Sequence, residues 1–236
     1  MTALDPRLAK RVKLSDGGLI TKMLDIANGL DDVIKLGRGD PDLDTPKHII
    51  KAGQWALANG ATHYTHPLGI EPLRQAIADN IRHYGGADYA TDEIMITPGG
   101  QQGMFIIALS LLNPGEEIIV PCPGYNPYQQ AAEMSDAVVR KVPMTMATNF
   151  TLTAKMVEEH VTSNSKILVL INPNNPTGTV TPPDEVRKIA ELAKKHDLIV
   201  ISDEIYARLT FGNNTVVPVA SLPGMKDRTI TLSGFS

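Results

Sequence analysis

Short apolar runs alternate with longer amphipathic segments along most of the chain. Several of the short runs are apolar on both faces, which is typical of strands that are buried on both sides of a sheet. We predict strands at residues 93–97, 117–121, 137–143, 166–172, 198–204 and 228–233. The amphipathic segments between them predict helices at residues 101–112, 128–134, 153–161 and 182–196.

The order of these elements predicts the fold class. Strands and helices alternate, which favours an α/β fold with a mostly parallel central sheet and helices on both faces. Residues 182–196 begin with two prolines and end with Lys194, Lys195 and His196, a charge distribution that suits the helix dipole. In such a fold, ligands bind at the carboxyl ends of the strands.

The N-terminal region has a different character. Residues 1–46 contain one short helical segment and the loop LGRGDPDLDTP, which is dense in Gly and Pro. We therefore predict a division of the chain into two parts. Residues 1–46 form an N-terminal arm with a segment of a smaller domain, and residues 47–236 form the large domain.

Composition narrows the class of protein. Of the 236 residues, 42% are hydrophobic and 20% are charged, and the net charge is −4, so the charge indicates no binding to nucleic acid or to an anionic membrane. The single cysteine, Cys122, excludes an internal disulfide framework and is interpreted as a small buried hydrophobe. Because no apolar run suits secretion or membrane spanning, the sequence predicts a cytoplasmic protein that acts on small molecules.

Two motifs follow predicted strands and have polar side chains that could bind a ligand. NPNNPTG (172–178) is a rigid turn rich in side-chain amides. SDEIY (202–206) places Asp203 at the end of an apolar strand, where a carboxylate is costly unless it meets a cation or a donor. Alternatively, the first motif is an ordinary turn, and Asp203 caps a helix with Tyr206 packed beneath it.

Two further turns have weaker signals. TPGGQQG (97–103) is either a phosphate cradle at a helix N-terminus or a plain helix-entry turn. PCPGYNPY (121–128) holds Tyr125 on a stiff turn, where its ring could stack on a flat heterocycle or simply pack. The acids Glu116 and Glu117 are interpreted as a solvated turn before a strand. Together, the four motifs outline a pocket for a flat phosphorylated ring.

The motifs, in this order, resemble those of the class I and II, fold-type I aminotransferases that use pyridoxal 5'-phosphate (PLP). The resemblance rests on GRGDPDLDTP, HYTHPLGIEPLR, ITPGGQQG, PCPGYNPY, NPNNPTG, SDEIY and the closing TLSGFS. NPNNPTG and SDEIY are the most specific of these. The resemblance implies that residues 47–236 are a large PLP-binding domain, incomplete at its C-terminal end, with the rest of the small domain outside this sequence.

The resemblance also implies a role for each matched residue. Asp203 pairs with the ring nitrogen of PLP and keeps it protonated, which makes the ring an electron sink. Tyr206 and Asn175 hydrogen-bond the phenolic oxygen of the ring, and Tyr125 stacks on it. The implied phosphate contacts are backbone N–H groups of Gly100 and Gln101, a hydroxyl of Ser233 or Ser236, and Tyr64 of a neighbouring subunit.

The same resemblance implies substrates and a partner. Gly39, Asn175 and Tyr125 would contact the substrate, and the position of Tyr64 implies a homodimer with shared active sites. The implied reaction moves an amino group between an L-amino acid (aspartate, alanine or aromatic) and a 2-oxo acid such as 2-oxoglutarate, without a metal. The alternatives are a PLP-dependent lyase or synthase of the same fold, a non-catalytic PLP-fold binding domain, and a nucleotide-binding α/β protein.

The family's Schiff-base lysine is expected directly after Ser236, the last residue of the sequence. Either the polypeptide ends there, or the next residue is a modified lysine that is not written as a standard amino acid. We favour the second explanation, because a parallel sheet that stopped here would lack its covering elements. The intact mass of the purified protein distinguishes the two.

Overall fold

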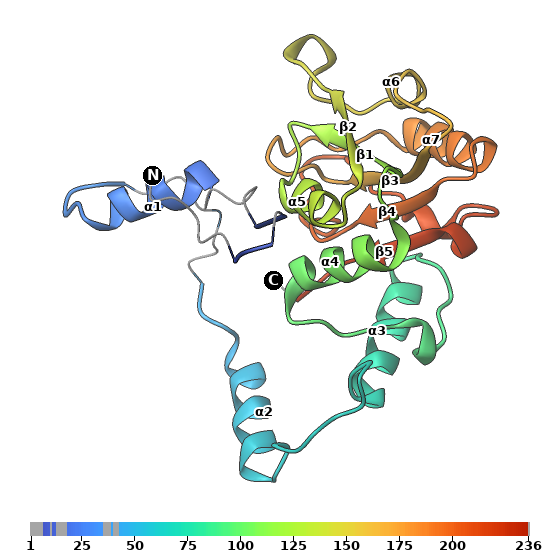
Figure 1. The fold of residues 1–236 in the computed structure, drawn as a ribbon. Coiled ribbons are helices and arrows are strands. Elements are labelled where there is room, and N and C mark those ends of the chain that lie inside the picture. The colour runs from blue at the N-terminus through green and yellow to red at the C-terminus, as the bar shows by residue number, and fades with distance from the viewer. Residues whose placement is uncertain (1–6, 10, 13–17, 35–38, 40–42, 236) are drawn as a thin grey trace. The chain divides into compact units, whose positions relative to one another are not determined.

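The computed structural model describes residues 7–9, 11–12, 18–34, 39 and 43–235 (Figure 1). The chain divides into two compact units, Met1–His66 and Pro67–Ser236, and each is described by itself. The first unit contains α1 (Gly18–Asn28) and α2 (Lys47–Ala58). The domain boundary expected between residues 46 and 47 stays a prediction.

The second unit is built on a parallel sheet. In its described part, five strands lie in the order β2-β1-β3-β4-β5. They are β1 (Glu117–Cys122), β2 (Val138–Pro143), β3 (Ser165–Ile171), β4 (Ile199–Asp203) and β5 (Thr229–Leu232). Ile171 pairs with Asp203, and Asp203 pairs with Leu232, so the last residues of three neighbouring strands lie side by side. The parallel α/β fold predicted from the sequence is confirmed.

Helices cover both faces of this sheet (Figure 1). The α-helices of the unit are α3 (Glu71–His83), α4 (Gly99–Leu111), α5 (Pro127–Met134), α6 (Ala154–Glu158) and α7 (Pro183–Lys195). The short 3-10 helices are η2 (Thr91–Glu93), η3 (Met146–Thr148), η4 (Val219–Ser221) and η5 (Lys226–Arg228).

Alternate side chains of β3 enter two separate hydrophobic clusters. Leu168 and Leu170 pack in the cluster that includes residues of α6 and α7. Ile167, Val169 and Ile171 pack in the cluster that includes residues of α4 and α5. Because successive residues of a strand point to opposite faces, both faces of the sheet are hydrophobic core, as the continuous apolar run of this strand predicts.

Most of the predicted elements are confirmed, but two differ from the prediction. The strand predicted at residues 93–97 is wrong, since Glu93 is the last residue of η2 and the residues after it belong to no strand of the sheet. Within the described chain, the Ile96 N–H donates to the Leu68 carbonyl at 3.0 Å, and one such bond does not make the ladder that defines a strand. The helix expected at 153–161 is shorter, because α6 ends at Glu158.

Glu117 is buried, so its interpretation as part of a solvated turn is wrong. Its side chain is 3% exposed. The carboxylate accepts hydrogen bonds from Arg140 at 2.7 Å, Thr162 Oγ1 at 2.7 Å and Ser165 Oγ at 3.1 Å. The bond from Arg140 is the main cause that holds the pKa of Glu117 below its usual value. These contacts offset the cost of burying the charge and tie together the amino ends of β1, β2 and β3.

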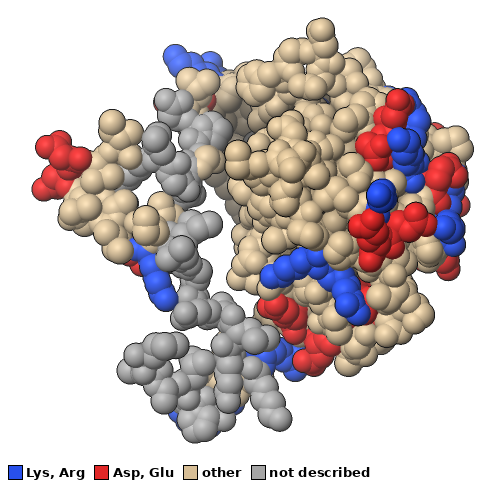
Figure 2. Space-filling view, turned by 90° about the horizontal axis from the view of Figure 1, so that it is seen from above, with Lys and Arg blue, Asp and Glu red and all other residues tan. Residues whose placement is uncertain are grey.

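Basic and acidic side chains lie next to one another on the face of the molecule that Figure 2 shows. Ion pairs also lie along α7, where Arg187 pairs with Asp184 and Lys188 pairs with Glu185. Among the described helices, none combines the length and the apolar character needed to cross a membrane. The His, Cys, Asp and Glu side chains that the structure describes form no group of three that could hold a metal ion.

Candidate active site

The loops that follow β1, β3 and β4 meet at the carboxyl edge of the sheet, beside the first turn of α4. Asn174 Nδ2 donates to the carbonyl of Pro123 at 3.2 Å and so joins the loop after β3 to the loop after β1. A methyl group on Gly100 would lie 3.2 Å from Leu232 Cδ2, at the end of β5. The fold therefore brings the four motifs found in the sequence to one edge of the sheet.

Asp203 is the last residue of β4, and it is only 3% exposed. Its Oδ2 accepts a hydrogen bond from the Tyr128 hydroxyl at 2.7 Å, and its Oδ1 accepts one from the Ile205 N–H at 3.2 Å. Burial raises the pKa of this carboxyl group, and the two hydrogen bonds oppose part of that effect. Among the described residues, no Lys, Arg or His pairs with Asp203 within 4.0 Å, so the ionised form lacks a charge partner.

Residues 205–208 form a turn, and no helix begins at Asp203. The contact between its Oδ1 and the N–H two residues later is typical of an Asx turn. The alternative that Asp203 caps a helix above Tyr206 is therefore wrong. The turn directs the chain so that the Tyr206 side chain is half-buried near the loop after β3.

Asn175 and Tyr206 come from different loops and meet at the same edge. Asn175 Nδ2 lies 3.5 Å from the Tyr206 hydroxyl, although the two residues are 31 positions apart in the sequence. The loop that carries Asn175 is held by neighbouring amides, because Asn172 Oδ1 accepts a bond from the Thr181 N–H at 2.9 Å. The pair thus presents an amide and a phenol together, which are the two groups expected at the phenolic oxygen of the ring.

Gly100 and Gln101 lie in the first turn of α4, where backbone N–H groups have no partner within the helix. No side chain caps this end of α4, so its N–H groups and the positive end of the helix dipole suit a phosphate. Gln101 Nε2 donates to the Tyr125 hydroxyl at 3.0 Å. Tyr125 is thereby held beside the expected phosphate position, as a stacking role requires.

The roles predicted for four other residues rest on the resemblance alone. Ser233 follows β5 at the same edge and is exposed. Ser236 lies outside the described residues. Gly39 and Tyr64 belong to the first unit and are exposed, and the site is described within the second unit alone. The roles of these residues stay predictions.

Tyr128 is the site residue that the sequence reasoning missed. The sequence predicts Tyr128 only as the first residue of the helix at 128–134, yet its hydroxyl contacts Asp203 directly. The available signal was the second tyrosine of PCPGYNPY, three positions after Tyr125, which is the spacing of neighbours on one helix face. Sequence alone does not reveal the contact because Asp203 is 75 residues away.

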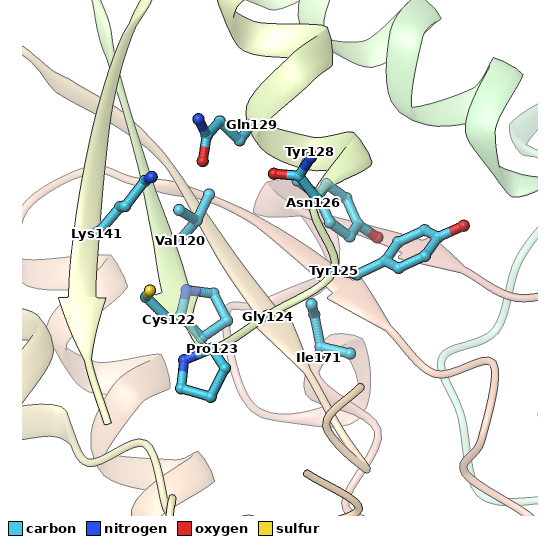
Figure 3. A pocket seen from close by; sticks show the side chains of 11 residues that line it. Val120, Cys122, Pro123, Gly124, Tyr125, Asn126, Tyr128, Gln129, Lys141 and Ile171 are labelled. Atoms are coloured by element: carbon cyan, nitrogen blue, oxygen red, sulfur yellow. The ribbon is translucent and has the colours of Figure 1, made fainter. Parts of the chain in front are cut away.

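A cavity of about 180 Å³ lies next to this site (Figure 3). Tyr125 and Tyr128 form part of its lining, and Cys122, Gln129 and Lys141 also line it. In Figure 3 the Tyr125 ring extends away from Cys122 and Lys141. Cys122 is exposed, so its interpretation as a small buried hydrophobe is wrong, because the last residue of β1 turns out of the core.

The fold and these contacts define an α/β protein whose sheet edge suits a phosphorylated ring with a basic nitrogen. The model of the family "Aminotransferase class I and II" matches residues 31–236. The chain belongs to this family, whose members depend on PLP. The resemblance noted from the sequence motifs is confirmed.

Individual relatives agree with this assignment. The chain is 39% identical over 205 residues to the bifunctional aspartate aminotransferase and glutamate/aspartate-prephenate aminotransferase of Petunia hybrida, covering 86% of this chain and 43% of that protein. It is 36% identical to aromatic-amino-acid aminotransferase 2 of Thermococcus litoralis, covering 97% of this chain and 59% of that protein. The chain therefore spans about half the length of these relatives.

Solved structures show the same fold. The aspartate aminotransferase of Thermus thermophilus with maleate superimposes with a TM-score of 0.90 at 32% identity, over 96% of this chain and 60% of that chain. The N-succinyldiaminopimelate aminotransferase of Mycobacterium tuberculosis superimposes with a TM-score of 0.88 at 32% identity, over 96% of this chain and 59% of that chain.

Proposed function

We propose that the protein binds PLP and acts as an aminotransferase between an L-amino acid and a 2-oxo acid. The observation that carries this proposal is Asp203, a buried carboxylate with no cationic partner among the described residues, at the edge of the sheet that also holds Asn175, Tyr206 and the start of α4. A buried anion of this kind suits a protonated ring nitrogen. The names of the relatives favour amino transfer over a lyase or synthase reaction.

The residues of this chain fit the chemical groups of PLP. When bound, PLP supplies an electron sink for the carbanion chemistry at the α-carbon of an amino acid. Asp203 would accept a hydrogen bond from the ring nitrogen and hold its proton there. Asn175 and Tyr206 would bind the phenolic oxygen, and the Tyr125 ring would stack on the cofactor. The N–H groups of Gly100 and Gln101 would bind the phosphate.

The proposed donors are aspartate, alanine and aromatic amino acids, and the proposed acceptor is a 2-oxo acid such as 2-oxoglutarate. The relatives named for aspartate and for aromatic amino acids support two of these donor classes. Gly39, Asn175 and Tyr125 are the proposed substrate contacts. A cytoplasmic location is proposed as well, because a chain with one cysteine suits a reducing compartment.

The proposed assembly is a homodimer in which Tyr64 reaches the phosphate site of the partner. The Tyr64 side chain is fully exposed, and on α2 the side chains of Ile49, Trp55 and Leu57 are more than half exposed. Exposed apolar surface of this kind is typical of protein interfaces. Light scattering during gel filtration should give twice the mass of one chain, and a monomer at all concentrations would contradict the dimer.

The cofactor proposal is tested by titrating the chain with PLP and following the absorbance of the bound cofactor. The unmodified chain should take up PLP. Asp203→Asn should weaken uptake about 10- to 100-fold, because the neutral amide lacks the negative charge that pairs with the protonated ring nitrogen. Asp197→Asn is the matched control, since the Asp197 side chain is 93% exposed and lies just after α7, on the surface. A chain that takes up no PLP would refute the proposal.

The reaction is tested separately with 2-oxoglutarate as acceptor and a panel of amino-acid donors. Formation of glutamate from the acceptor, with aspartate or an aromatic amino acid as donor, is the expected result. Asp203→Asn should abolish most of this amino transfer, whereas Asp197→Asn should leave it unchanged. In a protein whose intact mass shows that residues follow Ser236, PLP uptake without transfer from any donor would instead favour the non-catalytic binding domain.

A further inference from the structure

Tyr128 lies under the proposed cofactor site and is 2% exposed. It belongs to the first turn of α5, and its ring packs in the hydrophobic cluster formed with α4, β1 and β3. At 2.7 Å, its hydroxyl donates to Asp203 Oδ2 on the last residue of β4. One buried side chain thus connects α5 to the carboxyl end of a strand 75 residues away.

Tyr125 and Tyr128 donate to or accept from different partners. The Tyr125 hydroxyl accepts a bond from Gln101, at the first turn of α4. The rings of Tyr125 and Tyr128 pack edge to face, with centroids 6.4 Å apart and planes at 77°. This edge-to-face geometry is a favourable one for aromatic pairs. Tyr128 therefore supports the Tyr125 ring and holds the Asp203 carboxylate at the same time.

Two donors determine the orientation of the Asp203 carboxylate. The Ile205 N–H donates to Oδ1, and the Tyr128 hydroxyl donates to Oδ2, so rotation of the carboxylate would break both bonds. Each carboxylate oxygen can accept more than one hydrogen bond, so a further donor can still be bound. Both donors are neutral, so the negative charge of Asp203 stays available for a cation.

We infer that Tyr128 is a positioning residue, which holds the Asp203 carboxylate in one orientation, ionised and without a counter-charge from the described residues, for a protonated ring nitrogen. The inference rests on the proposed PLP function for its purpose, but the contact itself exists without the cofactor. A lysine or arginine at this place would neutralise the carboxylate, and an apolar residue would leave one oxygen buried without a donor. A phenol that is itself too buried to lose its proton avoids both outcomes.

The titratable groups around the carboxylate come from three segments. Tyr128 lies on α5, Tyr125 on the loop after β1, and Glu204 and Tyr206 on the segment after β4. Burial and the charge of Asp203 raise the pKa of Tyr128, so the phenol stays a donor over the whole neutral range. Burial also raises the pKa of Glu204, and the charge of Asp203 contributes to this.

The test follows the titration of Asp203 by 13C NMR on the chain with labelled aspartate, without PLP. Asp203→Asn identifies the signal. Tyr128→Phe removes one hydroxyl and keeps the packing of the ring, so the affinity of Asp203 for its proton should rise at least about tenfold, since a hydrogen bond to the ionised form is lost. Tyr125→Phe is the matched control, and it should leave the titration unchanged because that hydroxyl bonds to Gln101.

An unchanged Asp203 titration in Tyr128→Phe, or an equal change in Tyr125→Phe, would overturn the inference. If Tyr128→Phe does not fold, labelled tyrosine in the unmodified chain gives the answer. The Tyr128 Cζ signal should then show a step at the pH at which Asp203 titrates, and the absence of that step would also overturn it.

PLP uptake separates this inference from the proposed function. Tyr128→Phe should bind PLP several-fold more weakly than the unmodified chain. If the chain binds no PLP but the Asp203 titration responds to Tyr128→Phe, the contact is real and the proposed function is wrong. If PLP binds equally well to the Tyr128→Phe variant, the positioning role is wrong and the proposed function stands.

Discussion

Replacing Asp203 by Asn should make the cofactor-free chain more stable at neutral pH, although it should weaken PLP binding. The side chain keeps its shape, and its amide oxygen can still accept the Ile205 N–H that now bonds to Oδ1 at 3.2 Å. Its NH2 group would face the Tyr128 hydroxyl, 2.7 Å from Oδ2, and the phenol can rotate to accept that hydrogen. The substitution therefore removes a buried charge while both neighbours stay paired.

The gain combines two opposing effects. Removing the desolvated carboxylate stabilises the folded state, and turning the phenol from donor to acceptor costs about 1 kcal/mol of that gain. We expect a net increase of about 0.5–2 kcal/mol in the free energy of unfolding, the usual range for a single stabilising replacement. Asp203→Ala should instead destabilise by about 1–3 kcal/mol, because it leaves the buried Tyr128 hydroxyl without a partner.

The pH dependence distinguishes a charge effect from a packing effect. Burial raises the pKa of Asp203, so the folded state binds the proton more tightly than the unfolded state does. The contribution of this group to stability is fully present below the unfolded pKa, about 3.9, and is lost as the pH rises through the folded pKa. The advantage of Asp203→Asn over the unmodified chain should therefore grow with pH and then level off.

Urea unfolding followed by circular dichroism at several pH values between 4 and 8 measures this advantage. Asp197→Asn, at an exposed position, should change the free energy of unfolding by less than about 0.5 kcal/mol, which is usual for a surface substitution. An Asp203→Asn variant that is less stable than the unmodified chain at pH 7, or whose advantage is the same at pH 4 and pH 7, would refute the reasoning.

Two other predictions concern stability. Glu117→Ala should lower the free energy of unfolding by about 2–3 kcal/mol, because two hydroxyl donors and an arginine lose a buried charged acceptor. Urea unfolding measures this loss. The control is Glu191→Ala, which should lower the free energy of unfolding by less than about 0.5 kcal/mol because the Glu191 side chain is 73% exposed. Because the pKa of Glu117 is lowered in the folded state, its contribution to the free energy of unfolding is present above about pH 4.3 and is lost in acid. If Glu117→Ala lost the same stability at pH 3 as at pH 7, this prediction would be wrong. Gly124→Ala would place a methyl group 2.3 Å from the Pro121 carbonyl oxygen. The variant should therefore unfold at a lower temperature and bind PLP more weakly than the unmodified chain. Gly53→Ala, with open space around it on α2, should leave both unchanged or improve stability, and equal behaviour of the two glycine variants would exclude the steric cause.

The strands and the parallel sheet could be predicted from sequence because their signals are local. The run at 166–172 is apolar on both faces, and a strand of that kind must be covered on both sides wherever it lies. The segment at 93–97 has the same local pattern, but a strand also needs a neighbour, and within the described chain Ile96 makes a single backbone bond to Leu68. Pairing depends on which segments meet, which no local pattern records.

The candidate site could be predicted from the motifs at the strand ends for a different reason. Asp203 and Asn175 lie at carboxyl ends of strands, and a parallel sheet brings all such ends to one edge. Their sequence positions and the fold class together therefore predicted their proximity. The positions of Tyr64 and Gly39 relative to this edge could not be derived in this way, because they lie in the other unit.

The sequence by itself determined the alternation of strands and helices, the parallel sheet and the family, because hydrophobic periodicity and short motifs are properties of neighbouring residues. The burial of Glu117 and the bond from Tyr128 to Asp203 came only from the folded structure. Each of these contacts joins side chains that are far apart in the sequence, so their geometry depends on how the helices pack on the sheet. The same packing takes Asp203 out of water and leaves it without a cation among the described residues, and this is what makes it a candidate partner for the cofactor.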